Sequence, residues 1–272
     1  MSDITANREA QLKECIEELY ATFGGYRLPE GWREQLCDPK FTKEEILRST
    51  PLRKLTGADL TPYHWKAMTT WGTEEDFKHF VPRLLELIVP RVVPIESDMA
   101  SELEPCMVSN KLRYGRWSSW PEREREAIHR FYLALWSALL ASDSKVLAAP
   151  RVWLSIIAHA EDSIAEFLEI WDSDLHDEEL AYVATTHLAT SVGVYDWPAI
   201  SCHKVLEDYY AKLDAQNAEA VEWILSDRIF QLMEDAFFRW QDTPEAEHFS
   251  QAHHWLALLR QERRWKRSVA DL

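Results

Sequence analysis

Apolar side chains recur at helical spacing along nearly the whole chain, and this periodicity constrains the fold more than any other feature of the sequence. Near the N-terminus Leu12, Ile16 and Leu19 follow one another at intervals of four and three residues, and the pattern stops at a pair of glycines. No stretch longer than five residues alternates convincingly as a β-strand would. The sequence therefore predicts an all-α protein of roughly nine to ten helices, with antiparallel hairpins that form a bundle or a degenerate helical array.

Capping residues and prolines predict where the helices of the first half begin. Thr61 before Pro62 predicts the start of a helix that runs to residue 71. Thr73 with Asp76 has the pattern of a capping box and predicts the next start. Within that second helix, Pro82 should either kink the helix or begin a new one.

The remaining chain divides into an irregular segment and a series of helices. Residues 89–118 hold three prolines and little periodicity, so we expect no regular structure there. We expect residues 1–118 and 119–272 to form an N-terminal helical region and an acidic helical-hairpin region of one continuous domain. Helices are predicted over residues 121–141, 150–171, 177–191, 198–213, 218–225, 227–240 and 244–264.

Glycine is scarce, and this excludes several kinds of site. The chain has 7 glycines, where average usage would give roughly 19. Phosphate-binding loops, dinucleotide fingerprints and nucleophile elbows need glycines at fixed spacing, and none of these motifs is present. The sequence also lacks HExxH motifs and His pairs four residues apart, so we expect no metal and no cofactor.

Cysteine usage and hydropathy predict a cytoplasmic protein with no membrane partner. Cys15, Cys37, Cys106 and Cys202 are widely separated and form no CxxC pair, which favours reduced structural thiols. The N-terminus lacks the apolar core of a signal peptide. The longest nearly apolar run, residues 131–141, is shorter than the about 20 residues that a membrane span needs.

The net charge of -16 is concentrated in the second half of the chain. Residues 141–259 contain 22 Asp and Glu but only 6 Lys and Arg, and the stretch 161–179 has nine carboxylates and no Lys or Arg. Such a surface repels nucleic acid and attracts basic proteins, although a solvated face that keeps the chain soluble has the same composition.

These charges favour a protein-binding module with a basic partner and no nucleic-acid partner. An immunity or antitoxin-type inhibitor that covers the cationic site of a toxin is the sharpest version of this hypothesis, and the sequence leaves the oligomeric state open. An aromatic residue among the carboxylates would serve as an anchor. The predicted partner-binding residues are Glu166, Glu169, Trp171, Asp172, Asp174, Asp177, Glu178 and Glu179.

Two segments resemble a known group of proteins. Residues 51–87, PLRKLTGADLTPYHWKAMTTWGTEEDFKHFVPRLLEL, and residues 111–136, KLRYGRWSSWPEREREAIHRFYLALW, are similar to parts of a family of uncharacterised bacterial proteins with PLRxLT, TTWG and DFKHF[LV]PRxLEL elements. That family has no assigned activity, so the resemblance implies no catalytic residue. The basic side chains of these segments suggest a patch for an anion, formed by Lys78, His79, Arg83, Lys111, Arg113 and Arg116; ion pairs with carboxylates of the chain itself are the alternative.

An enzyme is the alternative function. Its site would be assembled from dispersed His and carboxylate groups in a groove between helices, and His159 and the pair His253 and His254 are the candidates. The stretch 172–183 resembles a calcium loop only superficially, because Asp177 and Val183 stand where that loop needs Gly and Glu. No catalytic residue follows from the sequence.

Overall fold

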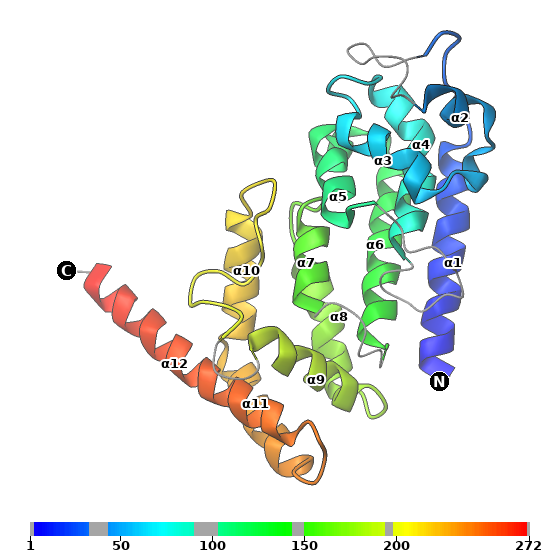
Figure 1. The fold of residues 1–272 in the computed structure, drawn as a ribbon. Coiled ribbons are helices and arrows are strands. Elements are labelled where there is room, and N and C mark those ends of the chain that lie inside the picture. Colours follow the sequence, from blue (N-terminus) through cyan, green and yellow to red (C-terminus); the bar gives the residue numbers. More distant parts are fainter. Residues whose placement is uncertain (1–2, 33–42, 90–102, 143–149, 194–197, 271–272) are drawn as a thin grey trace. The chain divides into compact units, whose positions relative to one another are not determined.

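The computed structural model describes residues 3–32, 43–89, 103–142, 150–193 and 198–270, and over these ranges the protein is all-α. The described residues contain twelve α-helices and no strand (Figure 1). The predicted class is confirmed, but the predicted count of nine to ten helices is too low. Short helices in the first half and a break inside a predicted long helix account for the difference. The arrangement as a bundle or array stays a prediction.

The chain groups into two compact units, Met1–Leu139 and Leu140–Leu272. The N-terminal unit contains α1 (Asp3–Phe23), α2 (Glu44–Ser49), α3 (Gly57–Lys66), α4 (Glu74–Ile88), α5 (Pro105–Tyr114) and nearly all of α6 (Glu122–Leu140), with two 3-10 helices at Leu52–Lys54 and Trp117–Ser119. Within it α4 packs against α1, α3 and α5. Helix α5 lies in the segment that we expected to be irregular, so that prediction is wrong for residues 105–114; residues 90–102 lie outside the described residues.

Buried aromatic rings form the core beside α4. Trp32 stacks on Trp71 with ring centroids 5.2 Å apart, and Tyr63 lies 4.5 Å from Phe80. Gly72 joins this cluster to α4 with a φ of +78°, in the left-handed region that favours glycine. A β-carbon at this position would lie 3.0 Å from the indole nitrogen of Trp32, so the close packing also needs glycine.

Helix α3 begins earlier than predicted. Its cap is Thr56, which forms a capping box with Asp59, and Pro62 lies inside the helix. The prediction of a start at Thr61 and Pro62 is therefore wrong. Proline has no N–H to donate to the carbonyl four residues before it, and here the Lys43 ammonium donates to that Ala58 carbonyl at 2.5 Å. This substitute donor explains why the helix tolerates the proline.

The predicted start of α4 is confirmed. The Thr73 hydroxyl accepts from the backbone N–H of Asp76 at 3.3 Å, and the Asp76 carboxylate accepts from the backbone N–H of Thr73 at 2.7 Å. Helix α4 continues through Pro82 to Ile88, so no new helix begins at the proline.

Substitution of Thr73 tests the contribution of this capping box. Thr73→Ala removes the acceptor for the Asp76 N–H and should lower the free energy of unfolding by about 1 kcal/mol. Thr73→Ser keeps the hydroxyl and should cost much less. Urea unfolding of both variants measures the difference, and equal stability of the two would show that the hydroxyl contributes nothing.

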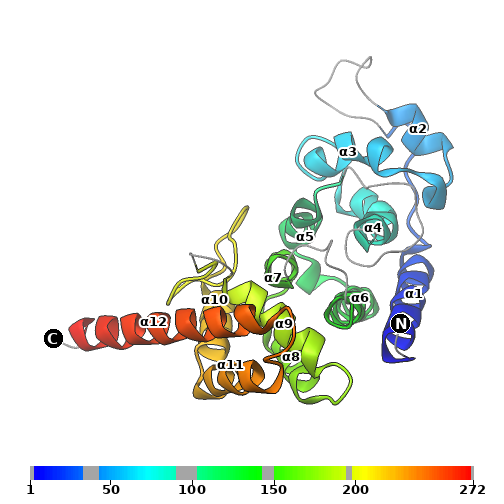
Figure 2. The ribbon, with the colours of Figure 1, turned by 60° about the horizontal axis from the view of Figure 1, so that its bottom comes forward.

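The C-terminal unit contains α7 (Pro150–Ala158), α8 (Ala165–His176), α9 (Ala181–Val192), α10 (Asp214–Ile224), α11 (Asp227–Arg239) and α12 (Ala246–Ala270). Helices α11 and α12 form the most extensive pair, and α9 packs against α7, α8, α11 and α12 (Figures 1 and 2). Within the described ranges, no helix combines the length and the apolar character that a membrane crossing requires.

The predicted single helix over 150–171 is wrong, because the non-helical residues 159–164 separate α7 from α8. Two side chains of α10 bind the backbone at this break. Gln216 donates to the carbonyls of Glu161 and Asp162 at 2.8 and 3.2 Å, and the Glu219 carboxylate accepts from the backbone N–H of Ile164 at 2.7 Å. These bonds satisfy backbone groups of the connection between the two helices.

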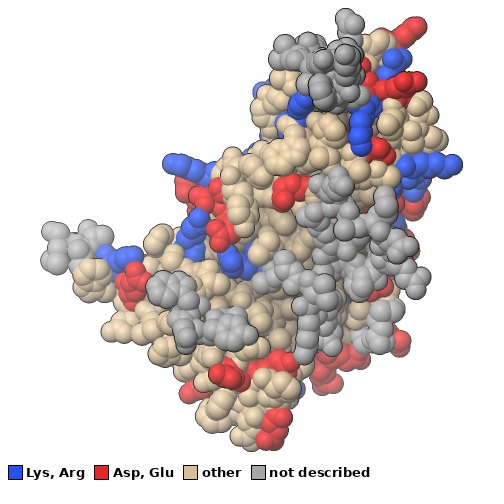
Figure 3. Space-filling view, in the orientation of Figure 1, with Lys and Arg blue, Asp and Glu red and all other residues tan. Residues whose placement is uncertain are grey.

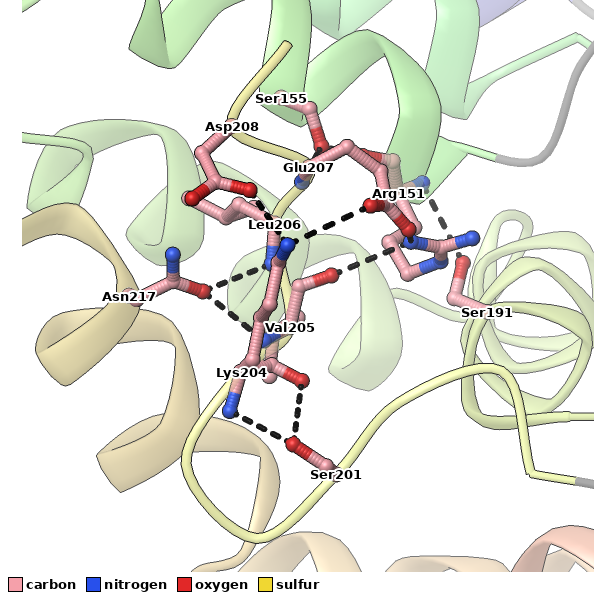
Figure 4. A network of polar contacts seen from close by, with 10 residues as sticks. All are labelled: Arg151, Ser155, Ser191, Ser201, Lys204, Val205, Leu206, Glu207, Asp208 and Asn217. Atoms are coloured by element: carbon pink, nitrogen blue, oxygen red, sulfur yellow. Dashed lines mark hydrogen bonds and ion pairs between the residues drawn. The ribbon is translucent and has the colours of Figure 1, made fainter. Parts of the chain in front are cut away.

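The predicted helix over 198–213 is also wrong. Figure 4 shows this segment in an irregular conformation, held by side chains of α7 and α10. The Asn217 amide oxygen accepts from the backbone N–H groups of Val205 and Leu206, both at 2.8 Å, and Ser155 accepts from that of Glu207 at 3.0 Å. These N–H groups therefore bond outside the segment and not to carbonyls of a helix.

Candidate functional site

A groove of about 510 Å³ opens in the C-terminal unit between the α8–α9 turn, α9 and α11. Apolar side chains of Leu175, Ala181, Leu232 and Ala236 form part of its lining. Charged side chains also line it: the carboxylates Asp177, Glu178 and Asp235 and the guanidinium groups of Arg228 and Arg239. The groove thus combines apolar surface with charged groups, as binding sites for amphipathic segments do.

The α8–α9 turn places the first two carboxylates. Helix α8 ends at His176, and the carboxylate of the following residue, Asp177, accepts from the backbone N–H groups of Glu179 and Leu180 at 2.8 and 3.1 Å. This bonding reverses the chain into α9 and leaves Glu178 exposed. The opposite wall comes from α11, where residues 228, 232, 235 and 239 are spaced to share one face of the helix.

The two arginines of the groove already have partners. Arg228 forms an ion pair with Asp172, which also accepts from the indole N–H of Trp223 at 3.4 Å. The Arg239 guanidinium lies over the Trp240 ring, 4.9 Å from its centroid. Both arginines remain exposed, as do the carboxylates of Glu178 and Asp235, and Asp235 also accepts from the Gln231 side chain at 3.2 Å. The groove therefore presents charges of both signs, and its two exposed carboxylates are the groups that can meet a basic partner.

The predicted partner-binding residues divide into exposed and buried groups. Glu166, Glu169, Glu178 and Glu179 are exposed. Trp171 is 1% exposed and donates to the Ala184 carbonyl at 3.1 Å, and Asp174 is 2% exposed. The predicted aromatic anchor is therefore a core residue in this structure. Asp172 and Asp177 are half-buried, and both form contacts within the unit, as described above.

In the N-terminal unit, Lys78 of the predicted anion patch lies inside the protein. Its ammonium is 3.0 Å from carboxylate oxygens of both Glu74 and Glu124 and 4.3 Å from the ring centroid of Trp120. Burial alone would lower the pKa of Lys78, but the hydrogen bonds to the two carboxylates outweigh it and raise that pKa. The charge of Lys78 is balanced internally.

Two further patch residues are bound to the backbone. Arg83 donates from Nε to the Leu55 carbonyl at 2.7 Å and from Nη1 to Glu86 at 2.6 Å. Lys111 is 5% exposed and donates to the Ala67 carbonyl at 2.9 Å. Burial lowers the pKa of Lys111, because the low-dielectric surroundings disfavour the ammonium. These cations support the packing of α3, α4 and α5.

The other three residues of the predicted patch differ in exposure. The His79 ring is 3.1 Å from the Tyr26 carbonyl through Nδ1, and burial lowers its pKa. Arg113 is half-buried, whereas Arg116 is exposed and has a φ of 49°. Of the six residues, Arg116 alone is exposed in the described structure.

The histidines proposed for an enzyme do not meet as one group. His159 is fully buried in the C-terminal unit, with its ring centroid 6.4 and 6.2 Å from those of Tyr209 and Tyr210. His253 stacks on Phe230. Among the described residues, no group of three or more His, Cys, Asp or Glu side chains could hold a metal ion.

No family model matches the chain, and neither does any curated protein or solved structure. The geometry of the groove is therefore the basis for a functional proposal. Sequence reasoning found one wall of the groove, Asp177 and Glu178, and missed the wall from α11. The spacing of Arg228, Leu232 and Asp235 on one helix face is the signal that could have indicated it.

Proposed function

We propose that the chain is a protein-binding module whose C-terminal unit receives a basic, amphipathic segment of a partner protein in the α8–α9–α11 groove. The groove itself carries this proposal, because its lining includes both apolar side chains and exposed carboxylates. Aliphatic side chains of the partner would lie against Leu175, Ala181 and Leu232, and its Lys or Arg side chains would reach Glu178 and Asp235.

The charge of the surrounding unit supports a basic partner. Residues 141–259 carry 22 acidic and 6 basic side chains, so the field around the groove attracts cations. Figure 3 shows acidic side chains gathered over the end of the unit where α11 turns toward α12. Glu166, Glu169 and Glu179 extend the exposed acidic surface. Such a surface accelerates association with a basic protein and makes it sensitive to salt.

More specifically, we propose that the chain is an immunity or antitoxin-type inhibitor. A protein that acts on nucleic acid has a cationic active site, and an acidic surface with an apolar groove is complementary to such a site. Binding would then cover the active site and block the substrate.

The proposal is tested by isolating the partner and reversing the charge of the groove. Pull-down from the native lysate at low salt should retain a stoichiometric basic protein that elutes as salt rises. With that protein purified, Glu178→Lys with Asp235→Lys should weaken binding about tenfold or more and flatten its salt dependence, as measured by titration calorimetry.

A matched control changes the net charge by the same amount elsewhere. Glu14→Lys with Glu126→Lys reverses two exposed carboxylates of the N-terminal unit and should leave the affinity within a factor of about two. Equal weakening by the two double variants would show that binding follows net charge and not the groove. Absence of any specific basic protein at low salt would remove the basis of the proposal.

A further inference from the structure

A second groove in the C-terminal unit gathers arginines on an otherwise acidic protein. Arg260, Arg263 and Arg264 lie on α12 at spacings of three and four residues, so their side chains share one face of the helix. They line a groove of about 360 Å³ together with the α10–α11 turn, which contributes Ser226 and Asp227. Neither the protein-binding proposal nor the predicted anion patch includes this groove.

Arg260 lines this groove and has one unused donor. Its side chain is 18% exposed, and its guanidinium carbon lies 4.6 Å from the ring centroid of Phe230. Nη2 donates to Asp227, whereas Nη1 is buried and has no hydrogen-bond partner among the described residues. Because a buried charged donor without an acceptor is costly, an oxygen acceptor that reached Nη1 would stabilise this guanidinium.

The other two arginines can also turn toward a ligand. Arg263 donates to Glu222 at 2.5 Å, and Arg264 is exposed and forms no ion pair or side-chain hydrogen bond within the described part of the chain. The carboxylate side chains of Asp227 and Glu222 are 96% and 71% exposed. Exposed pairs of this kind are weak, so an anion can compete with them for the guanidinium groups.

The start of α11 adds further positive potential. Ser226 caps this 13-residue helix, and its hydroxyl accepts from the backbone N–H of Ile229 at 3.3 Å. The first turn of a helix carries partial positive charge and free N–H groups. Three arginines and a helix start therefore surround one groove, and both favour an anion with several oxygens.

We infer that this groove binds the phosphate group of a small ligand. A phosphate presents enough oxygens to accept from the three arginines that line the groove, whereas a carboxylate has only two. Arginine forks match phosphate oxygens in bidentate geometry. The ligand would displace Glu222 from Arg263 and leave that exposed carboxylate in solvent.

Titration calorimetry of the full chain at constant ionic strength tests this inference, with inorganic phosphate and pyrophosphate as probes and acetate as the comparison. We expect phosphate or pyrophosphate to bind at one site and acetate to bind at least tenfold more weakly. Tighter binding of pyrophosphate would identify a diphosphate ligand, and equal binding a single phosphate group. No binding of either probe at millimolar concentration would overturn the inference.

Three substitutions assign the binding to the groove. Arg264→Gln should lower the affinity about tenfold or more, because it removes a charged donor. Glu222→Gln should raise it several-fold by releasing Arg263. Arg123→Gln, which changes the net charge equally but lies in the N-terminal unit and lines neither groove, should leave it unchanged. Equal losses for Arg264→Gln and Arg123→Gln would show that the anion responds to net charge alone, and the inference would be wrong. Circular dichroism of each variant checks that the helices are intact.

Discussion

Lys78→Met is expected to lower the free energy of unfolding by about 3–5 kcal/mol, the range found when one partner of a buried ion pair is removed. The Lys78 side chain is 6% exposed and that of Glu124 is 10% exposed. Methionine keeps the volume of the side chain but leaves Glu124 with the Tyr26 hydroxyl, at 2.6 Å, as its remaining hydrogen-bond partner within the described ranges. The large loss arises because a buried carboxylate then loses the cation that balances it.

Two further variants separate this cause from a loss of packing. Adding Glu124→Gln to Lys78→Met removes the unbalanced charge and should recover much of the lost stability. Lys204→Met breaks a pair with Asp208 in which both side chains are more than 40% exposed, and it should change stability far less. Guanidinium unfolding of all variants measures these differences. If Lys78→Met cost no more than Lys204→Met, the buried pair would not stabilise the fold.

Short sequence motifs predicted a helix start correctly where the capping hydrogen bonds join residues close together in the chain. The capping box of Thr73 and Asp76 joins residues three positions apart, so the sequence contains both partners within one short motif. At Pro62 the same kind of reasoning failed. The helix continues through the proline because Lys43, which is distant in sequence, donates to the open Ala58 carbonyl.

The larger errors in the fold have non-local causes. Residues 198–213 have helical apolar spacing, but Asn217 and Ser155 accept from the backbone N–H groups that a helix would use. Residues 159–164 interrupt a helical stripe because Gln216 and Glu219 of another helix bind the open backbone groups. Periodicity reports which residues can be buried together, whereas these bonds depend on which elements meet.

The sequence predicted only part of the candidate site, because the groove is formed by elements that lie far apart in the chain. The acidic composition of residues 161–179 located the α8–α9 turn, but composition does not distinguish the exposed Glu178 from Asp174, which is buried. The second wall of the groove comes from α11, about fifty residues further along the chain, and the sequence contains no signal that pairs the two. The sequence likewise did not show that Lys78 is buried, since its partner Glu124 lies on another helix.

Acidification is expected to destabilise the N-terminal unit through His64. This ring is fully buried on α3, where Nδ1 lies 2.7 Å from the Thr61 carbonyl, and Nε2 has no hydrogen-bond partner among the described residues. Burial, together with the positive charge of Lys111, lowers the pKa of His64 from 6.5 to about 4, despite the opposing hydrogen bond to Thr61. The folded protein therefore holds His64 neutral over a range in which the unfolded chain protonates it.

The contribution of His64 is complete above pH 6.5 and is lost as the pH falls toward 4, because the unfolded state binds the proton first. At about 1.4 kcal/mol for each pKa unit, the loss approaches about 3 kcal/mol. Carboxylates also titrate at the acidic end, so the measurement is the difference between the unmodified chain and His64→Gln, each unfolded in urea at pH 7.5, 5.5 and 4.5. The stability of the unmodified chain should fall more steeply than that of the variant, and NMR of the His64 ring should show it still neutral at pH 5.5. Parallel pH profiles, or a ring already protonated at pH 5.5, would show that burial does not control this histidine.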